Sequence, residues 1–245
     1  MPKAPSKTWK PLRVAILMSG RGSVANAILE SPENGRAYHV VCIFTDNPKS
    51  NARALAKKFK IPCEQNDLAA FYRKKGKPKS DLSVRPDFDQ ITVKKIKKHE
   101  PDVLAYAGYM AIASTVLVNA FLGVNVHPAD LSILDKNGNR KYVGAHAVRD
   151  AILAGEKQLR ATTHVISDKV DSGPILIRSK PIPVRLPNDF DPNDEEQVAH
   201  EARKHQEKLK KAGDFVIFPQ TLKGIAEGTL TTSSSNGPFN KQKSQ

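Results

Sequence analysis

The chain has 245 residues, of which 39% are hydrophobic and 26% are charged, and this composition predicts a globular protein with a substantial core. Its only cysteines, Cys42 and Cys63, fit neither a disulfide framework nor a metal-ligand cluster. The basic N-terminus lacks the apolar stretch of a secretory signal, and no run approaches the roughly 18 apolar residues of a membrane span. We therefore expect a cytoplasmic protein that has no membrane partner and holds no metal.

The net charge of +14 admits three interpretations: nucleic-acid binding, attraction of phosphorylated or polyglutamate-bearing anions, and a merely basic soluble protein. The lysine-rich stretches 73–79 and 94–98 lack the interleaved aromatic residues that would stack on bases. We therefore expect small anionic molecules, and no nucleic acid, as partners.

Strands and helices alternate along the chain. Nearly continuous apolar runs predict buried strands, and in chain order these runs lie at 13–18, 40–45, 102–108, 123–127, 161–167 and 174–182. Apolar residues at helical spacing predict helices, which lie at 24–30, 51–61, 88–100, 144–155, 194–211 and 214–227. This alternation predicts an α/β fold with a doubly wound, mainly parallel, Rossmann-like sheet and helices on both of its faces.

The organisation expected from this pattern is a single domain at residues 13–230. A basic tail, residues 1–12, precedes the first predicted strand. The last residues, 231–245, read TTSSSNGPFNKQKSQ, and this small, polar composition predicts a disordered C-terminal tail.

The first predicted strand ends in a glycine-rich turn, SGRGS, at residues 19–23. The backbone N–H groups of such a turn, and the helix N-terminus that follows, can face an anion, and Ser23 adds a hydroxyl group. The same residues loosely match a dinucleotide-binding fingerprint, and Asp46 ends the second strand where that motif binds a ribose. An anion site, an NAD-dependent oxidoreductase and a tight structural turn are all open interpretations of this segment.

A second group of polar residues lies where two later strands end. Asn125 and His127 are separated by one residue in a predicted strand, so their side chains point to the same face. Asp168 and Asp171 flank the turn after another strand, where the sequence Asp-Ser-Gly-Pro also suits purely structural turn chemistry. Ligands in open α/β sheets sit beyond the carboxyl ends of the strands, so we expect these groups to converge there. An amide, an imidazole and a carboxylate suit acyl transfer without a protein nucleophile.

Six segments of the chain occur in an order that resembles the folate-dependent formyltransferase family, and within it the glycinamide ribonucleotide formyltransferases. These segments are VAILMSGRGS, RPDFDQI, DVLAYAGYMAI, NVHP, YVGAH and HVISDKVDSGPIL. The resemblance implies transfer of a formyl group from the co-substrate 10-formyltetrahydrofolate to the primary amine of glycinamide ribonucleotide, a step of purine biosynthesis. It implies neither a metal nor a covalent enzyme intermediate.

The resemblance also implies roles for particular residues. It implies a catalytic trio of Asn125, His127 and Asp171, in which the charge of Asp171 would raise the pKa of His127 above its free value of about 6.5. The implied substrate-binding residues are Gly20, Arg21, Gly22, Ser23, Val24 and Glu207. The implied cofactor-binding residues are Arg85, Tyr109, Met110, Ala111, Ile112, Ala113, Asn125 and Asp168. The partners would be two small molecules, a phosphorylated amine and a folate, bound by a monomer or a homodimer.

Several positions differ from the family pattern around the acceptor amine. Arg21 and Val24 stand where the glycine-rich turn commonly has asparagines, Ala111 stands where an arginine is common, and the loop 128–144 is longer than expected. The same chemistry on another amine, such as an amino sugar or a hydroxylated amino acid, is therefore an alternative. Hydrolysis of formyltetrahydrofolate is a further alternative, whereas a dehydrogenase would leave the trio unexplained.

Overall fold

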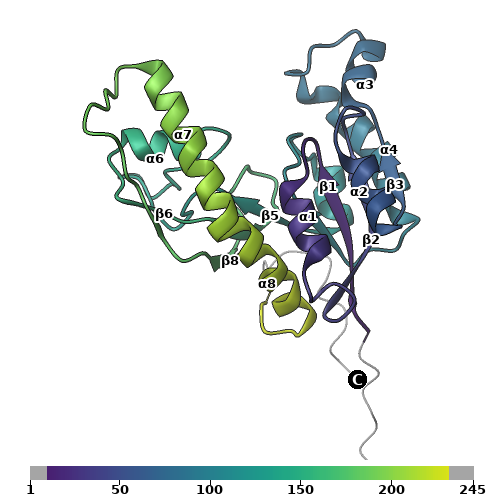
Figure 1. Ribbon diagram of the computed structural model, residues 1–245. Coiled ribbons are helices and arrows are strands. Elements are labelled where there is room, and N and C mark those ends of the chain that lie inside the picture. The colour runs from purple at the N-terminus through teal and green to yellow at the C-terminus, as the bar shows by residue number, and fades with distance from the viewer. Residues whose placement is uncertain (1–9, 232–245) are drawn as a thin grey trace, which may run out of the picture.

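The computed structural model of this chain describes residues 10–231 (Figure 1). Residues 1–9 of the predicted N-terminal tail and residues 232–245 of the predicted C-terminal tail lie outside the described residues.

Seven strands form one sheet in the order β3-β2-β1-β4-β5-β7-β8. The strands are β1 Leu12–Met18, β2 Tyr38–Thr45, β3 Cys63–Gln65, β4 Val103–Tyr106, β5 Leu122–His127, β7 Thr162–Val165 and β8 Ile175–Arg178. The five strands from β3 to β5 in the sheet are mutually parallel, whereas β7 is antiparallel to both of its neighbours. A separate antiparallel pair joins β6, Gln158–Leu159, to β9, Ile182–Pro183. The predicted α/β fold with a mainly parallel sheet is confirmed.

Helices cover both faces of this sheet, as Figure 1 shows. They are α1 Ser23–Glu30, α2 Ala52–Phe59, α3 Leu68–Lys75, α4 Arg85–Lys97, α5 Thr115–Ala120, α6 Ala147–Leu153, α7 Glu195–Leu209 and α8 Phe215–Ala226. The two faces can be followed along β1, because successive side chains of a strand point to opposite sides. Val14, Ile16 and Met18 belong to the core formed with α1, α2, α6 and α8, whereas Ala15 and Leu17 belong to the core formed with α4 and α5. Burial on both sides explains why this strand is an uninterrupted apolar run.

The structure differs from the predicted elements in short segments and at element ends. The predicted helix 144–155 is shorter, because α6 begins only at Ala147 after a turn. The predicted strand 174–182 is divided into β8 and β9, which belong to different sheets. The short elements β3, α3, α5 and β6 were not predicted at all.

The helices α7 and α8 form one rod, drawn from light green to yellow in Figure 1. Asp194 begins it, because its side chain accepts hydrogen bonds from the backbone N–H groups of Glu196 and Gln197. A π-helical turn, Lys210–Asp214, joins the two helices, where the sequence had predicted two separate helices with a break. The rod packs against α6 at one end and against α1 at the other, and α8 contacts the strands β1, β2, β7 and β8.

Candidate functional site

A cavity of about 580 Å³ lies where the parallel strands β4 and β5 end. Strand β5 contributes Asn125 and His127 to its wall, and β4 contributes Tyr106. The loops 108–113 and 166–171 form two further sides. The rod closes the remaining side with Gln206, Lys210 and Asp214. The cavity therefore brings together segments from the middle and the end of the chain at the edge of the sheet where ligands of open α/β folds bind.

His127 and Asp171 form a buried pair in the wall of this cavity. The Nδ1 atom of His127 lies 3.3 Å from Oδ2 of Asp171, and the two side chains are only 5% and 7% exposed. The other ring nitrogen, Nε2, donates to the backbone carbonyl of Tyr142 at 2.9 Å. Both neighbours of the ring are thus hydrogen-bond acceptors, and only the imidazolium can donate to both of them.

The protonation of this pair is set by burial and by charge together. Burial lowers the pKa of His127, and the nearby Asp171 carboxylate and Tyr142 carbonyl only partly oppose this effect. The predicted rise of the His127 pKa is therefore wrong, because desolvation of the imidazolium outweighs the attraction of one carboxylate. For Asp171, burial raises the pKa, but the nearby His164 ring, the charge of His127 and the Gly144 N–H together lower it to about 2. At neutral pH the pair is an Asp171 carboxylate beside a neutral His127 ring, and the unprotonated ring nitrogen faces an acceptor to which it cannot donate.

Asn125 is held by a second histidine on the neighbouring strand. His164 lies opposite Asn125 in the pairing of β5 with β7. Its Nδ1 donates to the Val165 carbonyl at 2.9 Å, so its Nε2 can accept the Asn125 amide, which lies 3.2 Å away. Nε2 of His164 also lies 3.4 Å from Oδ1 of Asp171. An amide nitrogen carries two N–H groups, so Asn125 retains one to donate to a ligand.

The turn that carries Asp171 is folded tightly against β7. Asp171 has a φ of 51°, in the left-handed region that side chains other than glycine rarely adopt. Gly173 lies so close to the strand that a Cβ atom there would be 1.8 Å from the Val165 carbonyl oxygen. These two positions direct the Asp171 carboxylate toward His127. The same carboxylate accepts a hydrogen bond from the Gly144 N–H, in the loop before α6, at 2.8 Å.

The wall opposite the pair is largely apolar. Residues 109–113 all line the cavity, as does Asp168, so the structure places most of the predicted cofactor-binding residues there. Met110 is 71% exposed and Ile112 is 47% exposed, although they are large hydrophobic residues. The loop that carries them is fixed from below, because the backbone N–H of Met110 donates to Oγ of Ser19. An exposed apolar wall next to polar groups is typical of a small-molecule site.

The predicted glycine-rich turn adjoins the cavity at the start of α1, where Val24 lines the wall. Gly22 has a φ of 75° and leads directly into α1 at Ser23. The β2–α2 loop steadies the turn, because Asn47 Nδ2 donates to the Ser19 carbonyl and the Asn51 N–H donates to that of Gly20. Arg21 is exposed at the tip of the turn, so its guanidinium is free to meet an anion.

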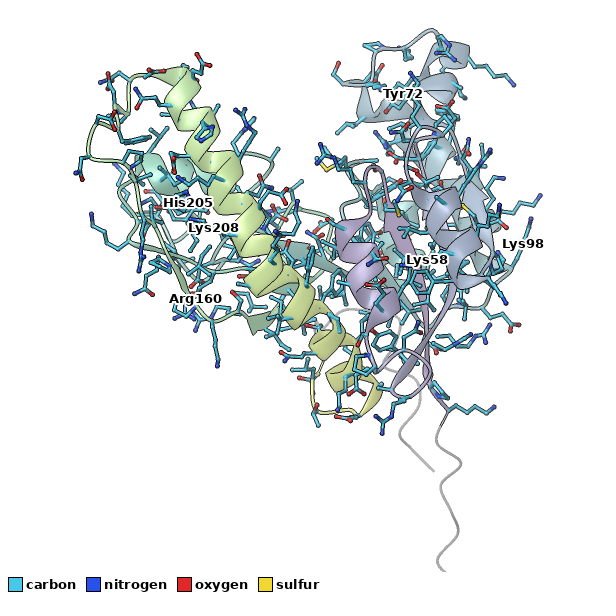
Figure 2. The ribbon with its side chains drawn as sticks, viewed as in Figure 1. Lys58, Tyr72, Lys98, Arg160, His205 and Lys208 are labelled. Carbon is cyan, nitrogen blue, oxygen red and sulfur yellow. The ribbon has the colours of Figure 1, made fainter. Side chains whose placement is uncertain are left out.

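Arg85 lies behind the cavity wall and is only 4% exposed. Its guanidinium carbon lies 5.5 Å from the ring centre of Tyr72, which Figure 2 labels in α3, and 5.6 Å from that of Phe88. Within residues 10–231, Nε and Nη1 of Arg85 have no hydrogen-bond partner. The structure therefore does not bring Arg85 into the cavity with the other predicted cofactor-binding residues.

Glu207 is not among the residues that line the cavity, whereas another carboxyl group of the rod is. The Glu207 side chain is 59% exposed and accepts a hydrogen bond from Lys210 at 2.9 Å. Asp214, which the sequence reasoning missed, lines the cavity and is 5% exposed. Burial raises the pKa of Asp214 to about 7, and its Oδ1 has no hydrogen-bond partner among the described residues. Gln206, Lys210 and Asp214 are spaced by four residues, and this spacing is the signal that could have found them.

No helix between residues 10 and 231 is long and apolar enough to cross a bilayer. Over the same range, no three or more His, Cys, Asp or Glu side chains are grouped so as to hold a metal ion.

Comparison with known protein sequences finds the same family throughout. A family model described as formyl transferase matches residues 12–208. The chain is 30% identical over 170 residues to the phosphoribosylglycinamide formyltransferase of Bacillus subtilis (strain 168), covering 67% of this chain and 76% of that protein. It is 24% identical over 221 residues to the enzyme of that name from Escherichia coli (strain K12), covering 89% of each. It also matches the trifunctional purine biosynthetic protein adenosine-3 of Drosophila melanogaster, with 27% identity over 226 residues, but spans only 14% of that longer protein.

Solved structures share the fold. The glycinamide ribonucleotide transformylase 1 of Symbiobacterium toebii superposes with a TM-score of 0.70 at 24% identity, over 91% of this chain and 92% of that one. The phosphoribosylglycinamide formyltransferase of Bacillus halodurans superposes with a TM-score of 0.67 at 23% identity, over 94% and 100% of the two chains.

Proposed function

This chain belongs to the formyl transferase family, and from that membership we propose that it transfers the formyl group of 10-formyltetrahydrofolate to the amine of glycinamide ribonucleotide. The observation that carries the proposal is the convergence of Asn125, His127 and Asp171 in one cavity wall. The names of the relatives support the choice of acceptor. The apolar wall at residues 109–113 suits the flat ring system of a folate.

In the proposed reaction, the amine nitrogen attacks the formyl carbon and a tetrahedral oxyanion forms. The free N–H of Asn125 donates to this oxyanion, and such a preorganised donor is typically worth about 3–4 kcal/mol. The His127–Asp171 pair takes up the proton that the amine loses, and the ring then donates to both of its acceptors. The bond from carbon to the folate nitrogen breaks, that nitrogen receives the proton back from the His127 ring, and tetrahydrofolate leaves.

We assign the acceptor side of the cavity to the rod and the glycine-rich turn. Asp214 is the carboxyl group of the rod that lines the cavity, so we propose it in place of Glu207 as the partner of the acceptor amine. A phosphate would lie at the turn from Gly20 to Val24, near the N-terminus of α1. Arg21 can pair with that phosphate in a charge-assisted hydrogen bond.

The test is to supply purified protein with 10-formyltetrahydrofolate and glycinamide ribonucleotide and to follow the acceptor's gain of one formyl group by mass. His127→Ala and Asp171→Asn should each lower kcat by about 100-fold or more, because a positioned general base and the group that orients it typically contribute about 10²- to 10⁴-fold. Wild-type turnover in either folded variant would remove the proposed mechanism.

Formyl transfer to an amine other than glycinamide ribonucleotide is the second candidate. It is favoured by Ala111 and Arg21, which both differ from the residues usual in the family. A panel of amino sugars and hydroxylated amino acids in the same mass assay separates the two. Formylation of a panel member, with none of glycinamide ribonucleotide, would replace the proposed acceptor and keep the formyl transfer.

A further inference from the structure

The segment between β5 and α6 contains a loop, residues 133–144, that contacts the His127–Asp171 pair through Tyr142 and Gly144. We call it the Arg140 loop. It is an ordered hairpin, since Leu134 bridges to Arg140 and the Lys141 N–H donates to the Ile133 carbonyl at 2.9 Å. At its tip, the Asp135 carboxylate accepts hydrogen bonds from the backbone N–H groups of Asn137 and Asn139. The loop is therefore held by its own contacts and can support a neighbouring segment.

Arg140 reaches from this loop to the turn that carries Asp171. Its Nη1 donates to the Asp171 backbone carbonyl, and its Nη2 donates to the Gly173 carbonyl at 2.7 Å. One planar guanidinium thus joins two carbonyl oxygens of the same turn, which a lysine ammonium cannot reproduce with the same geometry. The side chain is part-buried, so the two hydrogen bonds are partly shielded from water.

The turn needs such support because its backbone is strained at Asp171, the residue whose carboxylate faces His127. Asp171 has a φ of 51°, a conformation that persists in a residue other than glycine only where surrounding contacts fix it. Its carboxylate must lie 3.3 Å from Nδ1 of His127 for the pair to share a proton. The Arg140 loop supplies two more contacts to the pair, the Gly144 N–H on Asp171 Oδ2 and the Tyr142 carbonyl on His127 Nε2.

We propose that Arg140 is a positioning residue for formyl transfer, which locks the Asp171 turn through its forked hydrogen bonds and makes the Arg140 loop part of the active site. This inference rests on the proposed function for its kinetic consequences, but not for its structural ones. Arg140 touches neither the cavity nor a reacting atom, and acts only through Asp171. A misplacement of about 1 Å at a reacting group can lower a rate by about 100-fold, so displacement of Asp171 after loss of the two Arg140 hydrogen bonds should slow formyl transfer.

The experiment compares Arg140→Ala and Arg140→Lys with the matched control Arg160→Ala. Arg160 is also a part-buried arginine that donates to a backbone carbonyl, that of Ser179 at 2.8 Å, but away from the site. We expect both Arg140 variants to lower kcat by about 10- to 100-fold with little change in either KM. The Arg160 variant should retain the wild-type kcat. Arg140→Lys keeps the positive charge but loses the pair of hydrogen bonds to the two carbonyls, so it separates the effect of the charge from the effect of the paired hydrogen bonds.

A second readout does not depend on activity. The Gly144 N–H is protected from hydrogen exchange by its bond to Asp171 Oδ2, so its exchange should become at least about tenfold faster when the turn is released. This should occur in both Arg140 variants and not in Arg160→Ala. If the wild-type protein formylates no amine, the proposed function fails, and the exchange measurement still decides the role of Arg140. Wild-type kcat in Arg140→Lys, or unchanged exchange at Gly144 in that variant, would overturn the proposal.

Discussion

His127 meets two acceptors with its two ring nitrogens, while burial disfavours the charge that would satisfy both. A neutral ring in this position leaves either the Asp171 carboxylate or the Tyr142 carbonyl facing a lone pair. A proton taken from the amine would remove that conflict at the moment when the oxyanion forms. The residue is therefore suited to accept a proton and to hold it briefly, as a general base must.

This environment predicts the pH dependence of the reaction. If neutral His127 is the base, log kcat/KM should rise with pH through the pKa of His127, which burial lowers from its ordinary value. The Asp171 charge works in the opposite direction, so Asp171→Asn should lower the pKa of His127 further and move the rising limb to lower pH. Activity profiles and the ring-nitrogen NMR signals of His127 measure the shift. A limb that stays in place would show that Asp171 acts through geometry alone.

Asp214 predicts a second pH effect, this time on stability. Burial raises the pKa of Asp214 from its ordinary 3.8 to about 7. Between these values the unfolded chain releases the proton while the folded protein keeps it. Stability from this group is thus complete below pH 3.8 and is lost as pH rises through about 7, by as much as about 4 kcal/mol. Asp214→Asn stays neutral, so its unfolding free energy relative to wild type should increase over this range.

Urea unfolding at several pH values checks the expectation, with the exposed Asp150→Asn as a control that should run parallel to wild type. A constant difference between Asp214→Asn and wild type across the range would contradict the raised pKa.

The elements that the sequence predicts well are those whose burial leaves no ambiguity. Strand β1 is fully buried from Val14 to Met18, so its residues must all be apolar whatever their neighbours are. The elements that were missed lack such a signal. Strand β3 has only three residues, all half-buried, and the only buried residue in α5 is Leu117. Their formation depends on packing that no local pattern records.

The same contrast applies to the site. Asn125 and His127 could be predicted because the alternation of a strand places both on one face. Asp214 was missed because the sequence predicted a break between the helices 194–211 and 214–227, and the four-residue spacing of Gln206, Lys210 and Asp214 indicates a common face only where the rod is continuous. Arg140 left no trace in the sequence, since its partners are backbone carbonyls that any residue provides.

The turn between β1 and α1 is the expected site of the acceptor's phosphate. If the acceptor's phosphate lies at this turn, Arg21→Ala should raise the KM for glycinamide ribonucleotide by about 10- to 100-fold, the effect of losing a charged hydrogen bond worth about 1.5–3 kcal/mol. The KM for 10-formyltetrahydrofolate should hardly change, because the folate is expected at residues 109–113. Steady-state kinetics with each substrate varied measures both values. An unchanged acceptor KM would argue against a phosphate at the turn.

The molecule as a whole carries a net charge of +14. Basic residues are spread widely over it, and Figure 2 labels Lys58 on α2 and Lys98 after α4, away from the rod. A field of this kind attracts anionic substrates from a distance and raises their rate of encounter.

The field predicts sensitivity to salt. Raising the ionic strength from about 0.01 M to about 0.15 M shortens the Debye length from about 30 Å to about 8 Å, so kcat/KM for glycinamide ribonucleotide should fall by about tenfold. The kcat should change little, because it is measured at saturating substrate, where the rate of encounter no longer limits turnover. Stopped-flow or steady-state rates across this range test the idea, and a flat kcat/KM would show that encounter is not steered by charge.

The rod determines when the cavity is completed during folding. The pair at residues 127 and 171 and the carboxyl at 214 come from three distant points of the chain, and the last of them arrives only with α7 and α8. Closing such long loops has an entropic cost that is recovered only after most of the sheet exists. The cavity is thus a late product of folding, so a half-folded chain has strands and a core but no place for a substrate to bind.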